Sequence, residues 1–153
     1  MSALLTAMAL WLSANFGLPP PRDVPSVRFV DPTEILVFRY RAFTPEKRRE
    51  VIANFAAAPD QKRNVVAVYD EANHTVLLPV GWSGGTPAEL SVLLHEMVHH
   101  LQAAAGLRYE CPAAREKMAY AAQEKWLGLF NLTLASEFGL DAFTLKVATE
   151  CMY

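Results

Sequence analysis

The chain has 153 residues, of which 52% are hydrophobic and 20% are charged, and its formal net charge is −2. This length and composition predict one globular domain over residues 1–153 and exclude a disordered chain. The sequence contains no basic run and no stripe of basic and aromatic residues, so we expect no nucleic-acid partner.

The apolar run at residues 3–12 could be taken for the core of an export signal. However, no Lys or Arg precedes Arg22, so the positively charged start of such a signal is missing. The run is also too short to cross a bilayer, and we expect no membrane span. Its large apolar side chains recur at helical spacing, which predicts an amphipathic helix ending near Gly17 and the prolines at 19–21. An export signal that is removed is the alternative.

Three further elements are expected before residue 60. Residues 27–30 predict a short strand. The segments 31–34 and 44–46 each place a capping residue before a proline, and they predict helices through about Tyr40 and about Ala57. We expect the charged residues of the second helix to form a solvated face.

Residues 65–69 and 75–79 are rich in β-branched and apolar side chains and flank turn-forming residues at 70–73, which predicts a β-hairpin. We therefore predict an α+β fold that is mainly helical. His74 lies in the predicted turn, where we expect it to be exposed rather than to bind a metal. The edge of such a sheet can accept an extended peptide as an added strand.

A helix is expected from Thr86 to about Ala105. Thr86 can cap this helix, Pro87 stands at its first position, and Glu89 follows three residues after the cap. Gly106 favours its end. Because the helix is strongly apolar, the polar side chains on it need partners.

This helix contains the motif His-Glu-x-x-His as His95, Glu96 and His99. Residues four apart lie on one face of a helix, so the two imidazoles can hold one metal ion. Glu96 can reach a water on that ion without being a ligand. In zinc peptidases with this motif, zinc lowers the pKa of the water to about 7 and the glutamate takes its proton. The motif therefore predicts one zinc ion per chain, with Glu96 as the general base.

Catalytic zinc usually has three protein ligands. In metzincins a glycine and a third histidine follow the motif, but Gln102 and Ala105 stand at those positions, so that pattern is excluded. No histidine follows His100, which leaves a carboxylate as the third ligand. The candidates are Glu110, Glu116, Glu124 and Glu137.

We choose Glu116 among these candidates. It lies one turn inside a helix that we expect from residue 113 to about 130, and the small Ala119 on the same face would let two helices approach closely. Glu110 lies in the preceding turn, and Glu124 belongs to a pair of charges typical of a solvated face. Both remain alternatives, as does a Glu116 that only pairs with a basic neighbour at the surface.

The motif, followed by Glu116, Ala119 and Tyr120 on the next helix, resembles the small gluzincins, which are minimal zinc-peptidase-like domains. The stretches 82–102 and 111–126 are also similar to an uncharacterised bacterial family of about this size. The resemblance implies a zincin-like (minigluzincin) domain with a small sheet packed on the motif helix. It also implies zinc on the two histidines and Glu116, with the glutamate of the motif as general base. The aspartate with which larger members hold a ligand histidine has no counterpart in this sequence.

A peptidase also benefits from a hydrogen-bond donor aimed at the oxyanion that develops during the reaction. Tyr120, Tyr109 and His100 are the nearest candidates in the sequence, and we choose Tyr120. Each of them is also explained as a packing or surface residue. Gln123 shares the face of Glu116 and can hydrogen-bond a metal ligand.

Cys111 and Cys151 are the only cysteines. We predict that they form a disulfide, which would close a loop of about 40 residues. Such a bond implies an oxidising compartment, so the protein would be periplasmic or secreted. Two free thiols in a cytoplasmic protein are the alternative. Asp141 predicts a last helix through about Thr149, which the disulfide would fasten to the helix of Glu116.

The leading hypothesis is a zinc-dependent metallohydrolase that cleaves peptide bonds in a peptide or protein substrate. The first alternative is a zinc-binding or protein-interaction module on a peptidase-like scaffold, with weak catalysis or none. The second is a purely structural helical domain without metal. The sequence predicts neither the cleavage specificity nor the oligomeric state.

Overall fold

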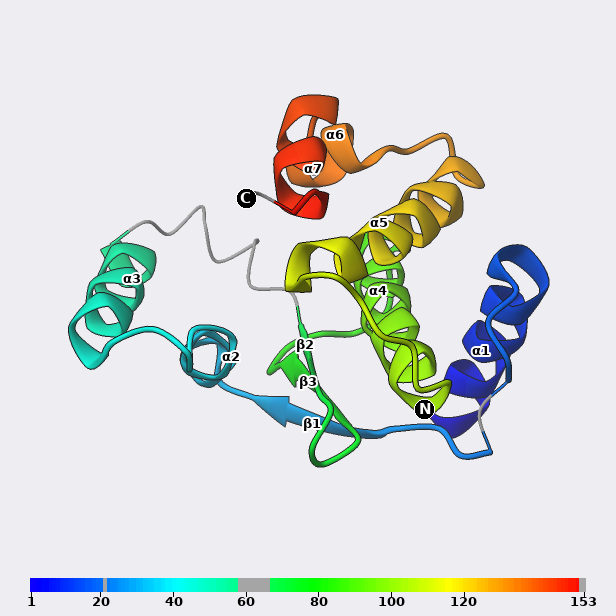
Figure 1. Cartoon of the computed structure of the whole chain (residues 1–153), viewed down its shortest axis with the longest axis horizontal. Helices are drawn as coiled ribbons and strands as arrows, with labels where there is room; N and C mark the ends of the chain where they lie inside the picture. Colours follow the sequence, from blue (N-terminus) through cyan, green and yellow to red (C-terminus); the bar gives the residue numbers. More distant parts are fainter. Residues whose placement is uncertain (21, 58–66, 152–153) are drawn as a thin grey trace. The chain divides into compact units, whose positions relative to one another are not determined.

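The computed structural model describes residues 1–20, 22–57 and 67–151. These residues form seven helices and one three-stranded sheet, so the fold is mainly helical with a small sheet, in agreement with the predicted α+β class (Figure 1). None of the helices in these ranges combines the length and the apolar composition that a bilayer crossing requires.

The chain divides into two compact units, and the larger consists of Met1–Pro25 and Gly84–Tyr153. Its helices are α1 (Ser2–Phe16), α4 (Pro87–Ala104), α5 (Pro112–Gly128), α6 (Leu134–Phe138) and α7 (Ala142–Thr149). Helix α4 carries the motif, and α5 packs against α4, α1 and α7 (Figure 1). The fully buried apolar side chains of these helices include Leu12, Leu93, Leu94, Met97, Leu101, Leu127 and Leu134.

The helix boundaries follow the capping residues of the sequence. Oγ1 of Thr86 accepts a hydrogen bond of 3.1 Å from the backbone N of Glu89 at the start of α4. Oδ1 of Asp141 accepts one of 2.8 Å from the backbone N of Thr144 at the start of α7. Gly17 ends α1 with a φ of 67°, in the left-handed region that glycine adopts without strain. All three ends were expected from the sequence.

Helix α5 ends at Gly128, two residues before the end near Phe130 that was predicted. The backbone N–H groups of Phe130 and Leu132 both donate to the carbonyl of Leu127, which turns the chain away from the helix axis. Asn131 completes this turn with a positive φ of 58°, which is incompatible with a right-handed helix.

The smaller unit is Ser26–Ser83. It contains β1 (Ser26–Val30), α2 (Pro32–Arg39), α3 (Pro45–Ala57), β2 (Val68–Asp70) and β3 (Thr75–Pro79). Strand β3 lies in the centre of the sheet, antiparallel to β2, which confirms the predicted hairpin. It also pairs in parallel with β1, a pairing that was not predicted. Of the strand expected at residues 65–69, residues 65 and 66 lie outside the described residues. The core of this unit consists of Val30, Ile35, Leu36 and Leu77.

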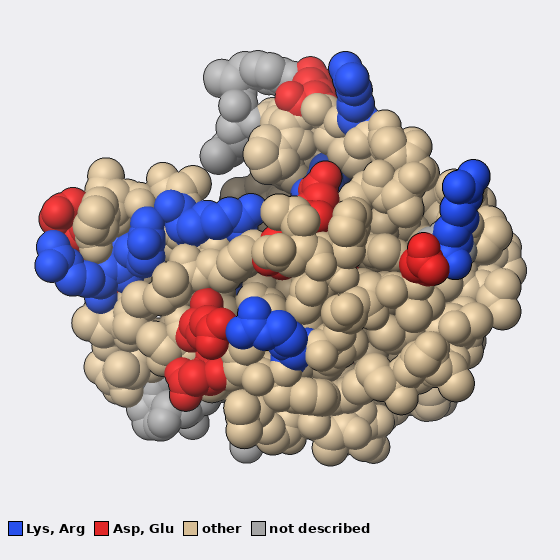
Figure 2. Space-filling model, turned by 90° about the horizontal axis from the view of Figure 1, so that it is seen from below, with Lys and Arg blue, Asp and Glu red and all other residues tan. Residues whose placement is uncertain are grey.

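Charged side chains on α3 form the solvated face that was expected. Lys47 pairs with Glu50 at 2.9 Å, and Arg49 pairs with Glu46 at 3.5 Å, each three residues apart on the helix. Arg48 departs from this pattern, because its guanidinium donates to three backbone carbonyls in the turn between α2 and α3. On the face shown in Figure 2, basic side chains lie beside acidic ones and most of the surface is uncharged.

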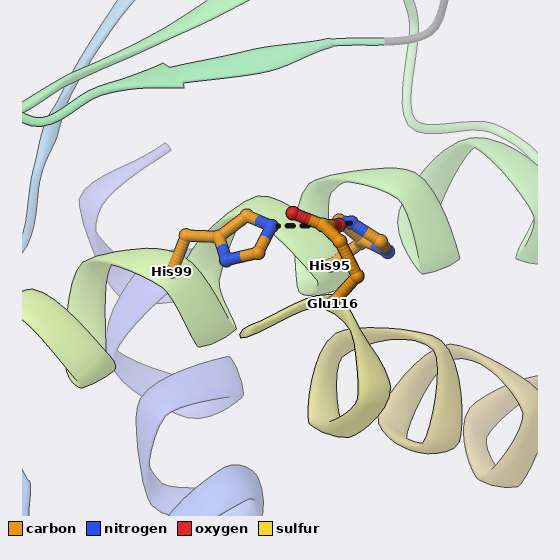
Figure 3. A group of neighbouring side chains, drawn as sticks. All are labelled: His95, His99 and Glu116. Carbon is orange, nitrogen blue, oxygen red and sulfur yellow. Dashed lines mark hydrogen bonds and ion pairs between the residues drawn. The ribbon is translucent and has the colours of Figure 1, made fainter. Parts of the chain in front are cut away.

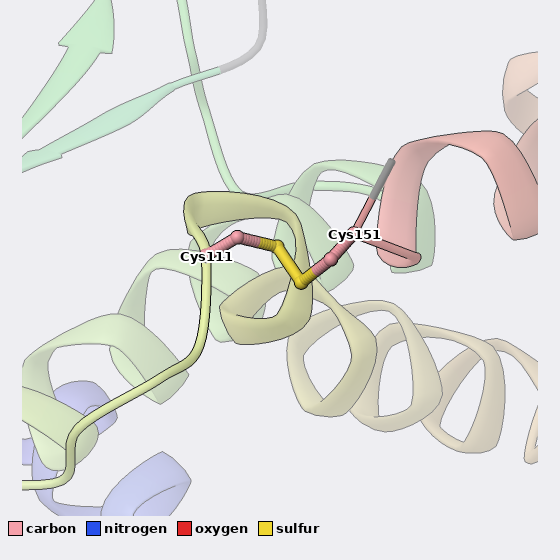
Figure 4. Close-up of a disulfide and its surroundings, with 2 residues drawn as sticks. All are labelled: Cys111 and Cys151. Carbon is pink, nitrogen blue, oxygen red and sulfur yellow. A yellow bond between two sulfur atoms is a disulfide. The ribbon is translucent and has the colours of Figure 1, made fainter. Parts of the chain in front are cut away.

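Cys111 and Cys151 form a disulfide, as predicted, with their Cα atoms 5.9 Å apart (Figure 4). Cys111 is the N-cap residue of α5 and Cys151 follows α7, so the bond fastens the C-terminal helix to the start of the helix that carries Glu116. The two cysteines are 40 residues apart in the sequence. In the chain-entropy model, a crosslink of this span stabilises the folded state by about 4 kcal/mol.

Breaking this disulfide is expected to lower the free energy of unfolding. A double variant with Cys111→Ser and Cys151→Ser should lose about 3 to 4 kcal/mol, because its unfolded chain regains conformational freedom. Urea denaturation of the wild type and the double variant, each with and without reductant, measures this loss. Reductant should destabilise the wild type and leave the double variant unchanged. A wild type that is equally stable in both conditions would contradict this contribution.

Candidate metal centre

Helix α4 places His95 and His99 on one face, one turn apart, and α5 brings Glu116 opposite them (Figure 3). Nε2 of His95 lies 3.0 Å from Oε2 of Glu116, and Nε2 of His99 lies 3.3 Å from the same oxygen. The two imidazoles meet edge to face, with their centroids 5.0 Å apart. One ligand atom from each of the three residues lies within 4.8 Å of the other two. The structure therefore brings together the two histidines and the glutamate that were chosen from the sequence.

These distances fit the ligand sphere of a metal ion. Zinc binds imidazole nitrogen and carboxylate oxygen at about 2.0–2.1 Å in a tetrahedral arrangement, which sets neighbouring ligand atoms about 3.3 Å apart. The two nitrogen–oxygen distances of 3.0 and 3.3 Å are close to this spacing. The group of His95, His99 and Glu116 could thus hold a metal ion.

The group is buried on the side of the histidines and accessible on the side of the carboxylate. The side chains of His95 and His99 are 9% and 7% exposed, whereas that of Glu116 is 31% exposed. An ion held by these three residues would therefore have one side that water can reach. Catalytic zinc sites share this property, while structural zinc sites are closed by a fourth protein ligand.

The electrostatics of the group favour a cation. Burial raises the pKa of Glu116, but the hydrogen bonds with His95 and His99 outweigh burial and hold this pKa well below its usual range. Burial lowers the pKa of His99, but the hydrogen bond with Glu116 and the charges of Glu96 and Glu116 outweigh it and raise this pKa. Glu116 is therefore ionised at neutral pH. Glu96 is 5% exposed, and its negative charge acts on the same site.

The Nδ1 atom of His95 faces away from Glu116 and contacts Gln123. Oε1 of Gln123 lies 3.1 Å from this nitrogen, as expected for a glutamine on the face of Glu116. Nε2 of Gln123 donates to Oγ of Ser91 at 3.1 Å, and this Oγ donates to the backbone carbonyl of Ala88 at 2.7 Å. Gln123 thus contacts the second ring nitrogen of His95 through a carboxamide that is itself held by Ser91.

The Nδ1 atom of His99 has two neighbours that were not expected from the sequence. Oε1 of Gln102 lies 3.0 Å from it, and Nε of Arg115 donates to it, also at 3.0 Å. Nε2 of Gln102 donates to the backbone carbonyl of Arg115 at 3.1 Å. Gln102 was recognisable in principle, because it is a polar residue three positions after His99 in an apolar helix. Nothing in the sequence indicates that Arg115 turns toward a histidine.

Other residues considered as ligands make different contacts. Oε2 of Glu124 accepts a hydrogen bond of 2.6 Å from the backbone N of Leu134 at the start of α6, and Glu110 is exposed. Nε2 of His100 donates to the backbone carbonyl of Asp23 at 3.0 Å, so it faces the N-terminal segment. These contacts account for Glu124 and His100 without a metal.

Tyr120 lies against the group of His95, His99 and Glu116. Its ring meets that of His95 edge to face, with the centroids 4.7 Å apart. Burial raises the pKa of the Tyr109 phenol, and the nearby charge of Arg115 partly offsets this increase. His74 is exposed in the turn between β2 and β3, where it hydrogen-bonds within its own hairpin.

A family model described as "Domain of unknown function (DUF6647)" matches residues 1–152. The chain belongs to this family. No curated protein and no solved structure matched the chain. The family description names no activity.

Removing a ligand is expected to weaken metal binding strongly. The wild type, purified without added metal and then given one equivalent of zinc, should retain about one zinc per chain after gel filtration, because three ligands converge on one point. His99→Ala and Glu116→Ala should bind zinc more than about 100-fold more weakly, since each loses a direct ligand and not only a supporting contact. Elemental analysis and chelator competition measure both quantities.

The matched control for this experiment is Glu110→Ala, which removes a carboxylate of the same type outside the group and should leave zinc binding unchanged. Wild-type affinity in Glu116→Ala would exclude Glu116 as a ligand. The third ligand would then have to be sought at Glu110 or Glu124.

Proposed function

We propose that this chain is a zinc-dependent hydrolase that cleaves peptide bonds. The observation that supports this proposal is the convergence of the two Nε2 atoms of His95 and His99 on a single carboxylate oxygen of Glu116. In sequence the glutamate of the motif directly follows the first of these histidines. These residues combine a donor set for zinc with a carboxylate that is not needed as a ligand.

His95, His99 and Glu116 are the residues that would hold the metal. A zinc ion in such a site lowers the pKa of a water molecule and polarises the carbonyl of the scissile peptide bond. The histidines supply neutral nitrogen ligands, and Glu116 supplies one negative charge. Because Glu116 is the most exposed of the three, its side of the group is where water and substrate would enter.

Glu96 has the role of general base in this proposal. Its carboxylate takes a proton from the attacking water and later gives that proton to the leaving amine. Its 5% exposure keeps this carboxylate away from bulk solvent, so the proton is transferred within the site. The charge of Glu96 already acts on His99, which indicates that the carboxylate lies within electrostatic reach of the ligands.

Tyr120 is our candidate for oxyanion stabilisation. Its ring packs against His95, so the phenol lies next to the metal-binding group. A phenolic O–H in this position would donate a hydrogen bond to the oxygen on which negative charge develops during the attack.

The disulfide between Cys111 and Cys151 adds a proposal about the place of action. Disulfides persist in oxidising compartments and are rare in the reducing cytosol. We therefore place the active protein in the periplasm or outside the cell, with a peptide or protein of that compartment as the substrate. Mass spectrometry of the protein from its native host, after alkylation without reduction, tests this assignment. Two alkylated cysteines would overturn it.

The decisive variant for the reaction is Glu96→Gln. It should retain zinc, because Glu96 is not a ligand, and it should lose hydrolysis by at least about 10²-fold, because the general base is gone. Tyr120→Phe should also retain zinc and lose about 10²-fold in kcat if its O–H stabilises the oxyanion. Digestion of a broad peptide library, read by mass spectrometry, measures turnover and cleavage sites together.

Glu110→Gln serves as the matched control, since it makes the same chemical change outside the site and should keep wild-type turnover. Full activity in Glu96→Gln would refute the assignment of the general base. Zinc binding without turnover in the wild type would favour the alternative of a zinc-binding or protein-interaction module on a peptidase-like scaffold.

A further inference from the structure

We infer that Gln123 and Gln102 are the positioning residues of the metal centre. Each carboxamide oxygen accepts the Nδ1 proton of one ligand histidine, and so Nε2, the nitrogen that contacts Glu116, is the one that a metal can take in place of its proton. This inference rests on the proposed metal site, and it names which tautomer each ligand adopts and which residue imposes it. Ligand histidines in metal sites generally depend on such a contact at their second nitrogen.

The orientation of the Gln123 carboxamide follows from a chain of hydrogen bonds. Oγ of Ser91 uses its only proton to donate to the backbone carbonyl of Ala88, so it must accept the bond from Nε2 of Gln123. Oε1 of Gln123 therefore faces Nδ1 of His95. Since a carbonyl oxygen can only accept, Nδ1 carries the proton. Gln123 is 4% exposed, which leaves little freedom for its carboxamide to turn over.

Gln102 repeats this arrangement at the second histidine. Its Nε2 donates to the backbone carbonyl of Arg115, which can only accept. Its Oε1 therefore faces Nδ1 of His99, and its side chain is likewise buried, at 2% exposure. Gln123 lies on α5 and Gln102 on α4, so the same contact between a carboxamide and Nδ1 of a histidine is formed from two different helices.

The two histidines differ in one respect, because Arg115 also donates to Nδ1 of His99. One nitrogen cannot donate to Gln102 and accept from Arg115 at the same time. The tautomer that accepts from Arg115 carries its proton on Nε2, where it donates to Glu116. The tautomer that donates to Gln102 leaves Nε2 bare for a metal. Gln102 therefore favours the metal-binding tautomer of His99, and Arg115 opposes it.

The test compares zinc dissociation constants, measured by chelator competition, for the full-length protein and its variants. Gln123→Met and Gln102→Met preserve side-chain length and remove the acceptor, and each should weaken zinc binding by about 10- to 100-fold. Gln123→Glu restores an acceptor at the same place and should bind zinc at least as tightly as the wild type. A residue needed only for packing would tolerate the two substitutions of Gln123 alike.

Arg115→Lys provides a second test with the opposite sign. It keeps the positive charge near the site and removes the Nε–H that competes for Nδ1 of His99. Zinc binding should therefore tighten by about 5-fold, the effect of one ordinary hydrogen bond. General damage to the site would weaken zinc binding in all variants alike. Weaker binding in Gln102→Met together with tighter binding in Arg115→Lys would therefore exclude a purely structural role for these residues.

Nitrogen-15 NMR of the histidine side chains in metal-free protein gives a readout without zinc. It should find a proton on Nδ1 of His95 in the wild type and a lower occupancy of Nδ1 in Gln123→Met, where only Nε2 still faces an acceptor, Glu116. Ser91→Ala removes only the hydroxyl that accepts a hydrogen bond from the Gln123 carboxamide, and it should weaken zinc binding less than Gln123→Met does. If Gln123→Met fails to fold, Ser91→Ala still tests the role of Gln123.

The outcomes distinguish the two levels of the proposal. A wild type that binds no zinc overturns the proposed function, while the NMR result still decides whether Gln123 sets the tautomer of His95. A wild type that binds zinc, with unchanged affinity in Gln123→Met and Gln102→Met, overturns this inference and leaves the proposed function standing. If Arg115→Lys binds zinc with the affinity of the wild type, Arg115 does not compete with Gln102 for Nδ1 of His99.

Discussion

The contact between the carboxylate of Glu116 and the two imidazoles of α4 is the interaction on which the larger unit depends. It joins the start of α5 to two successive turns of α4 and so fixes both the distance and the rotation between these helices. A partly buried carboxylate needs partners that offset its lost hydration, and the two histidines provide them. The fully buried Ala119 and Ala122 leave the room that this close helix packing needs. The same contact that could bind a metal is thus also part of the helix interface.

The start of α5 is held by covalent rather than by capping interactions. Cys111 is its N-cap residue but makes no side-chain capping hydrogen bond, and the sulfur is instead bonded to Cys151. Helix ends without a cap tend to fray, because their first N–H groups lack acceptors. Glu116 lies only five residues further on, so the disulfide and the proline at the first helical position keep the carboxylate in place. The geometry of the site is therefore linked to the redox state of a bond that is outside it.

Much of this arrangement could be read from local sequence patterns. The cap at Thr86, the final helix at Asp141 and the spacing of His95 and His99 are decided by neighbouring residues, so the sequence predicted them. Glu116 was chosen among four glutamates because it lies inside the next helix and because the small Ala119 on its face lets two helices approach closely. By contrast, the parallel pairing of β1 with β3 joins segments that are far apart in the chain, and no local signal specifies it. Arg115 was missed for a similar reason, since a basic residue on a helix usually faces solvent.

The neutral carboxamides behind the histidines bear on the chemistry that the site favours. A carboxylate in that position would raise the basicity of an imidazole and add negative charge next to the metal. Gln123 and Gln102 orient the imidazoles but neither raise their basicity nor add negative charge. An ion bound here would therefore keep more of its positive charge. Such an ion polarises a carbonyl or a water more strongly, at some loss of affinity. Together with the exposure of Glu116 to solvent, this choice of partners supports the hydrolytic role proposed above, because a structural metal site stabilises its fold through tight binding and a closed ligand shell.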